Sequence, residues 1–185
     1  MARQRLSRPA VAEQAIDLVD RDGFEALSLS AVAHALDVGP SALYTHVDGL
    51  EGLQYLVAVT ATDNLTADVR DAAIGTSGAD ALAAMGTAYR TFARDHPGQF
   101  ASTLLPPRSA DDDLASANRK LVDVFTLVYG AMGLDTEQSY LAARSTRSAI
   151  HGFLALEHVG GTSIAHDDEY DHLMSALYRG LLPAA

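Results

Sequence analysis

The chain has 185 residues, of which 48% are hydrophobic and 20% charged, a composition that suits a helical globular protein with a buried interface. Its net charge of −11 excludes a broadly basic surface, so any contact with a nucleic acid would have to come from local positive groups. It has no cysteine, no signal-peptide pattern and no apolar run near the roughly 18 residues of a membrane span. These absences exclude disulfides and predict a cytoplasmic protein with no membrane partner.

A short basic arm precedes the first predicted helix. Arg3, Arg5 and Arg8 give this arm its local positive charge. Ser7 can cap the helix, because its hydroxyl oxygen can accept from a backbone N–H of the first turn. The apolar residues recur at helical spacing as far as Gly23, which is expected to end the helix. They form one stripe: Val11, Ala12, Ala15, Ile16 and Val19.

The stretch from Ser28 to Leu53 predicts two short helices joined by a tight turn. The first helix has Ser28 as its N-cap and carries one apolar face, made of Leu29, Val32, Ala33 and Leu36. Gly39 is expected to take a positive φ in the turn, and Pro40 suits the first position of the second helix. That helix ends near His46, buries Leu43 and turns hydroxyl groups outward. This arrangement indicates a helix-turn-helix.

The same region carries a longer pattern. From Gly23 it reads G-F-x-x-L-S, V-A-x-x-L-x-V, S-A-L-Y-x-H-V and a closing L-x-x-L that ends at Leu53. Together with the preceding helix it resembles the DNA-binding domain of the TetR family. The resemblance implies an all-α protein with a three-helix DNA-binding domain over residues 1–50. It also implies a helical dimerisation and ligand-binding domain over residues 51–185 and a palindromic double-stranded operator as partner.

The resemblance places the second short helix in the DNA groove. By this resemblance, the residues expected to contact bases or phosphates are Pro40, Ser41, Tyr44, Thr45 and His46. Ser28 and Ser30 begin the preceding helix, where hydroxyl and backbone N–H groups favour a phosphate. Arg3 and Arg5 can reach the minor groove. Residues 48–51 are acidic where the family often has a lysine, so we expect modest affinity per head and specificity drawn from dimer symmetry.

The rest of the chain predicts helices and no sheet. They are expected at about 49–73, 79–95, 99–105, 114–131, 137–159 and 168–181. The acidic run 111–113 fits a helix start, and Thr136 is the expected N-cap of the fifth of these helices. That helix is rich in small residues, which favour close packing in the centre or across a two-fold axis.

Two body motifs carry a second resemblance. Y-R-x-F-A from Tyr89, followed by His96-Pro97, and H-G-F from His151 are similar to a W-H-G-motif subgroup of TetR C-terminal domains, with Ile150 at the tryptophan position. The subgroup implies a homodimer with an inducer cavity. It therefore implies a repressor that is released from DNA when a small-molecule effector binds. The expected lining is Met85, Tyr89, Phe92, Phe125, Tyr129, Arg144, Arg147 and His151. The last three share one helix face, where a charge needs an acid, solvent or an anionic ligand as partner.

Two other functions stay open. His166 to His172 is rich in possible metal ligands, although its spacing matches no tight helical zinc pattern. A helical interaction module with weak or no DNA binding is the second alternative, favoured by the acidic residues 48–51. No G-x-S-x-G, H-E-x-x-H or phosphate-loop motif is present, so we expect no enzyme activity, no cofactor and no metal site.

Overall fold

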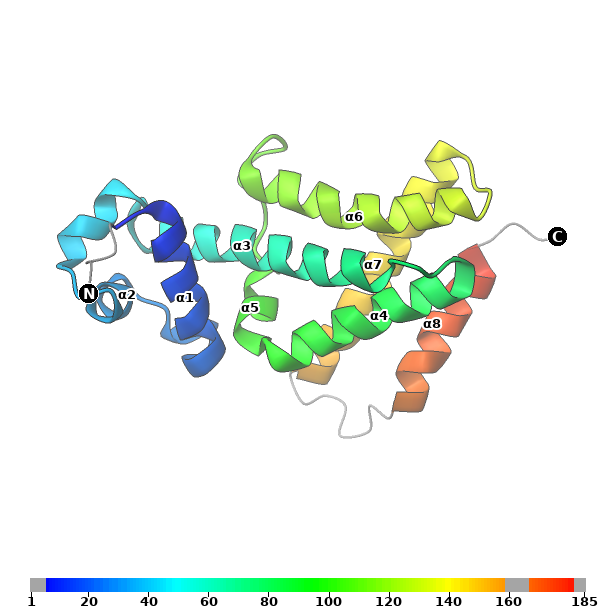
Figure 1. The fold of residues 1–185 in the computed structure, drawn as a ribbon, viewed down its shortest axis with the longest axis horizontal. Helices are drawn as coiled ribbons and strands as arrows, with labels where there is room; N and C mark the ends of the chain where they lie inside the picture. The colour runs from blue at the N-terminus through cyan, green and yellow to red at the C-terminus, as the bar shows by residue number, and fades with distance from the viewer. Residues whose placement is uncertain (1–5, 159–166, 182–185) are drawn as a thin grey trace. The chain divides into compact units, whose positions relative to one another are not determined.

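The computed structural model describes residues 6–158 and 167–181, and these residues are helical with no strand, as predicted (Figure 1). No helix among them is both long and apolar enough to cross a membrane. The elements are α1 (Arg8–Asp22), η1 (Phe24–Ala26), α2 (Leu29–Ala35), η2 (Pro40–Thr45), α3 (Gly49–Ala72), α4 (Gly78–Asp95), α5 (Pro97–Ser102), α6 (Asp113–Ala131), α7 (Thr136–His158) and α8 (Asp167–Leu181).

The chain divides into two compact units. The first contains the described residues up to 62 together with 96–115, and the second contains 63–95 with the described residues from 116 onward. Besides the predicted 1–50 segment, the first unit therefore includes the start of α3 and the short helix α5.

The core of the first unit forms from the apolar faces that the sequence predicts. Ser7 accepts a hydrogen bond from Ala10 N at 3.3 Å, and Ser28 accepts one from Ala31 N at 3.2 Å, which confirms both N-caps. Local capping and periodicity fix where α1 and α2 begin and which face they bury. Its fully buried side chains include Val11, Ala15, Val19, Val32, Ala33, Leu43 and Leu53.

The turn between α2 and η2 differs from the prediction. Gly39 has an extended conformation (φ −71°), and the positive φ of 54° belongs to Asp37. Val38 N donates to Ala33 O at 3.0 Å and Asp37 N to His34 O at 3.1 Å. This is a Schellman ending of α2, which needs a left-handed residue directly after the helix rather than two positions later. The second helix is a 3-10 helix, because six residues with little buried surface cannot sustain a regular α-helix.

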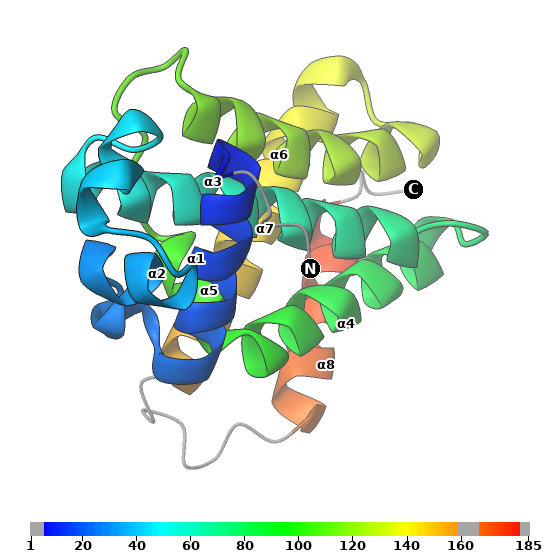
Figure 2. The same cartoon turned by 60° about the vertical axis from the view of Figure 1, so that its left-hand side comes forward.

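Helix α5 packs very closely on α1 (Figure 2). A Cβ built on Gly98 would lie 1.9 Å from the carbonyl oxygen of Val19, so the two backbones touch there. On the same side, His96 Nδ1 lies 2.8 Å and Gln99 Nε2 lies 2.7 Å from Asp20 Oδ2. A glycine and three polar side chains thus fasten the α4–α5 turn to the end of α1 within the first unit.

In the second unit, α4, α7 and α8 pack against one another. Tyr170 on α8 donates to Gly86 O on α4 at 2.6 Å, and Gly86 leaves room for Met174 on α8. The N-cap of α7 is Asp135 rather than the predicted Thr136. Asp135 Oδ1 accepts from Gln138 N at 2.8 Å, because the cap is the residue before the first helical position.

Candidate functional site

The outer face of η2 presents the hydroxyl groups predicted from the sequence. Leu43 is fully buried beneath it, whereas Ser41 and Thr45 are exposed and the Tyr44 side chain is 61% exposed. Tyr44 therefore does not pack into the bundle. Thr45 Oγ1 donates to Ala42 O at 2.8 Å, which leaves its oxygen lone pairs available to accept. Pro40 is exposed at the start of η2.

The start of α2 adds hydroxyl groups to this unit. Ser28 is half-buried, and its hydroxyl oxygen accepts a hydrogen bond from the backbone of its own helix. Its O–H proton therefore remains able to donate. Ser30 is exposed in the first turn, and His46 is half-buried directly after η2. Arg3 and Arg5 lie outside the described residues.

The described arginines of this unit are all engaged in local contacts. Arg8 lies 3.8 Å from Asp113, and Arg21 lies 2.6 Å from Asp22. Arg108 lies over the Tyr55 ring at 4.5 Å and also donates to a backbone carbonyl. The Arg8 pair is long and exposed, so a phosphate could replace the carboxylate at little free-energy cost.

Three of the predicted effector residues come together in the second unit. The hydroxyl of Tyr89 lies 3.0 Å from His151 Nδ1, and their rings meet edge to face at 6.1 Å between centroids. Arg147 lies beside them and donates to Asn118 Oδ1, a partner on α6 that the sequence did not indicate. Burial, and then the positive charge of Arg147, lower the pKa of His151 to about 4, so the imidazole is neutral at pH 7. Burial raises the pKa of Tyr89, which stays protonated.

The other predicted lining residues have two kinds of surroundings. Arg144 is exposed and lies over Tyr140 at 5.8 Å, so it is not part of the Tyr89–His151–Arg147 cluster. Tyr129 bonds to Thr146 Oγ1 at 2.6 Å, a contact across 17 residues. Met85, Phe92 and Phe125, like Tyr129, are at most 2% exposed and belong to the buried core.

A second polar cluster joins α4, α7 and α8. Arg90, which is 7% exposed, donates to Glu157 Oε1 and to Asp167 Oδ1, both at 2.9 Å, and lies over the Tyr170 ring at 4.8 Å. Arg94 donates to the same Glu157 oxygen at 2.7 Å. This network was not predicted from the sequence, although Arg90 lies within the quoted Y-R-x-F-A motif. A buried arginine of this kind fixes the packing of the three helices.

The metal alternative gains no support from the described residues, among which no three His, Asp or Glu side chains converge in a way that could hold an ion. His166 lies outside the described residues. The acidic run before α6 serves as a helix start: Asp112 accepts from Ala115 N at 2.7 Å and from Ser109 N at 2.9 Å.

Comparison with known proteins gives consistent matches. Residues 82–181 match the family described as "Tetracyclin repressor-like, C-terminal domain". An HTH-type transcriptional regulator of Mycobacterium tuberculosis is 34% identical over 157 residues, which cover 84% of this chain and 72% of that protein.

Solved structures share the fold. A Rhodococcus sp. RHA1 protein of unknown function has a TM-score of 0.77 at 21% identity, over 99% of this chain and all of that one. The regulator BioQ, solved with its natural double-stranded DNA operator, has a TM-score of 0.70 at 20% identity, over 96% of this chain and 98% of that one. At these identities the structures establish a common fold.

Proposed function

The chain belongs to the TetR family of HTH-type transcriptional regulators, and on that premise we propose that it is a homodimeric repressor whose operator affinity falls when a small molecule binds its C-terminal unit. The regulatory class follows from the family. The residues that contact DNA, the mode of pairing and the effector are the proposal.

The exposed face of η2 carries the DNA-binding proposal. The buried Leu43 fixes the helix on its neighbours, so Ser41, Tyr44 and Thr45 all face away from the core. Hydroxyl groups can donate to phosphates and to base acceptors, and a major groove admits one helix. Ser28 and Ser30 supply phosphate contacts at the start of α2, and Pro40, His46, Arg3 and Arg5 complete the surface.

A dimer supplies the second half of the site, because two recognition helices must lie about 34 Å apart, one DNA turn. Helix α7 presents an exposed face of small and apolar residues at helical spacing: Leu141, Ser145, Ser148, Gly152 and Leu156. Its two leucines are 56% and 60% exposed, which is apolar surface that a partner chain would bury. We place the two-fold axis on this face.

The effector site is the cluster of Tyr89, Arg147 and His151. Arg147 is half-buried, and among the described residues its side chain forms no ion pair with a carboxylate. A half-buried guanidinium with neutral neighbours favours an anionic ligand group. An effector with an acidic group would pair with Arg147 and accept from Tyr89, and its apolar part would meet Met85, Phe92, Phe125 and Tyr129.

Fluorescence anisotropy on an operator selected from genomic fragments tests the DNA-binding proposal. Tyr44→Phe should weaken binding about tenfold, since each of two half-sites loses one hydrogen bond. Tyr178→Phe, the same change on α8, should leave the affinity unchanged. Affinity should also fall steeply between about 50 and 200 mM salt. No duplex binding at low salt would instead favour the helical interaction module.

Two further measurements test the remaining parts. Ser148→Arg should yield monomers in sedimentation experiments, whereas Ser77→Arg, the same change in an exposed loop, should leave the dimer intact. A panel of aromatic carboxylates should release DNA more strongly than the matched neutral amides. Arg147→Met should keep DNA binding but lose this difference, and an unchanged difference would contradict the proposed role of Arg147.

A further inference from the structure

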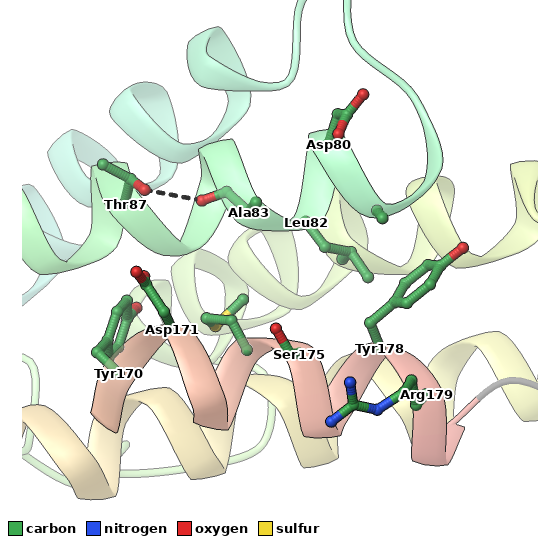
Figure 3. A pocket seen from close by; sticks show the side chains of 11 residues that line it. Asp80, Leu82, Ala83, Thr87, Tyr170, Asp171, Ser175, Tyr178 and Arg179 are labelled. Carbon is green, nitrogen blue, oxygen red and sulfur yellow. Dashed lines mark hydrogen bonds between the residues drawn. The ribbon is translucent and has the colours of Figure 1, made fainter. Parts of the chain in front are cut away.

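Helices α4 and α8 enclose a groove of about 560 Å³ that is separate from the Tyr89–Arg147–His151 cluster (Figure 3). The helices are held together at one end by the hydrogen bond from Tyr170 to Gly86 O and by the contact of Met174 with Gly86. Beyond that point the groove is bordered by Leu82 and Met174, and its volume lies within the range of small-molecule sites.

The polar groups of the groove have a defined arrangement. Figure 3 shows the Asp171 carboxylate directed from α8 toward α4 beside Thr87, while the Tyr178 ring extends toward α4 at the other end. Asp171 is exposed and forms no hydrogen bond or ion pair with another described residue. Thr87 Oγ1 already donates to Ala83 O at 2.9 Å, so it can only accept from a ligand. Arg179 lies on the α8 side of the groove.

This arrangement combines a carboxylate, an aromatic ring and apolar side chains along one groove. A carboxylate attracts a cation, and the face of a tyrosine ring stabilises an organic cation at short range. Leu82 and Met174 favour a ligand with apolar groups around its charge. Two carboxylates line the groove, Asp171 and Asp80, and among the described residues no group of three possible metal ligands converges, which argues against a metal ion as the occupant.

We propose that the α4–α8 groove is a binding site for a hydrophobic organic cation, such as a quaternary ammonium or phosphonium compound. The cation lies between Asp171 and the Tyr178 ring, and its apolar groups contact Leu82 and Met174. This site takes the opposite charge from the effector cluster and does not depend on the proposed repressor function.

The probes are tetraphenylphosphonium and tetraphenylborate, ions of similar shape and opposite charge, titrated calorimetrically into the full chain. We expect saturable binding of one phosphonium per chain, at least about tenfold tighter than the borate. Asp171→Asn should weaken phosphonium binding about fivefold and reduce the preference between the two ions. Asp168→Asn, an exposed acid in the first turn of α8 outside the groove, should change neither.

Because the chain has no tryptophan, single reporters can locate the bound ion. Tyr178→Trp should respond to the phosphonium at the calorimetric midpoint, and Tyr140→Trp on α7 should not. Ala83→Leu fills the groove from an exposed position and should abolish binding.

Three outcomes would overturn the proposal. Equal affinity for both ions, unaffected by Asp171→Asn, would mean that charge does not select the ligand. Binding that leaves the fluorescence of the Tyr178→Trp variant unchanged would place the ion elsewhere. A change of oligomeric state in Ala83→Leu, measured by sedimentation, would mean that a second chain covers the groove.

Discussion

The contact between Gly98 and Val19 gives the most specific stability prediction. In Gly98→Ala the new Cβ would lie 1.9 Å from Val19 O and 2.5 Å from the carbonyl carbon, whereas ordinary contacts begin at 3.4 Å. The atom that it meets is backbone, so no side-chain rotation relieves the clash. Helix α5 must move away from α1 by an ångström or more within the first unit. Overpacking of this kind costs about 1–3 kcal/mol.

The same movement lengthens two hydrogen bonds to Asp20. His96 and Gln99 reach its carboxylate at 2.8 and 2.7 Å, and a shift of about one ångström would exceed hydrogen-bonding distance. Each lost bond adds about 0.5–1.5 kcal/mol. The total loss of about 2–6 kcal/mol would lower the melting temperature by roughly 4–24 °C in a chain of this size.

Urea and thermal denaturation measure this difference directly. Gly130→Ala is the matched control, because the added Cβ would meet only Ser139 Oγ at 3.7 Å in an exposed part of α6. It should be neutral or more stable than the wild type by up to about 1 kcal/mol. A Gly98→Ala protein that melts within a degree or two of the wild type would refute the proposed backbone contact.

The polar clusters and the α2 turn give three further predictions. Arg90→Met should lower the free energy of unfolding by about 2–4 kcal/mol, because it removes the paired guanidinium from Glu157; an unchanged urea midpoint would contradict this role. The depressed pKa of His151 means that the unfolded chain binds the proton more tightly. The contribution of His151 to the free energy of unfolding should therefore be fully present above about pH 6.5. Between pH 6.5 and pH 4 the wild type should lose about 3 kcal/mol more stability than His151→Gln, and parallel pH–stability profiles of the two proteins would contradict this. Asp37→Gly should raise the melting temperature slightly, since glycine adopts the φ of 54° without strain; a lower melting temperature would indicate that the Asp37 side chain stabilises the turn.

The sequence predicts the features that depend on near neighbours in the chain. Ser7 and Ser28 cap their helices as expected, and the apolar stripes of α1 and α2 are buried, because capping and helical periodicity involve residues three or four positions apart. The predicted positions of α3, α4, α6 and α7 agree with the structure to within one or two residues. The TetR-family pattern in the first third of the chain consists largely of these capping and apolar residues.

The sequence pattern was less reliable in predicting which residue takes the left-handed conformation at the end of a helix. Gly39 was expected to supply the left-handed residue of the turn, but the Schellman bonds of α2 place it at Asp37. A helix can end one or two residues earlier without any change in its apolar pattern.

Only the tertiary structure decided which distant side chains meet. Gly98 touches Val19, Arg90 joins Glu157 across 67 residues, and Arg147 finds Asn118 on another helix. The α4–α8 groove likewise depends on two helices that are distant in sequence and that pack together where Gly86 admits Met174. The sequence therefore determined the helices and their buried faces, whose hydrogen bonds close within a few residues. Packing determined the polar clusters and the groove, because these contacts depend on how whole helices cross and no short-range pattern encodes that geometry.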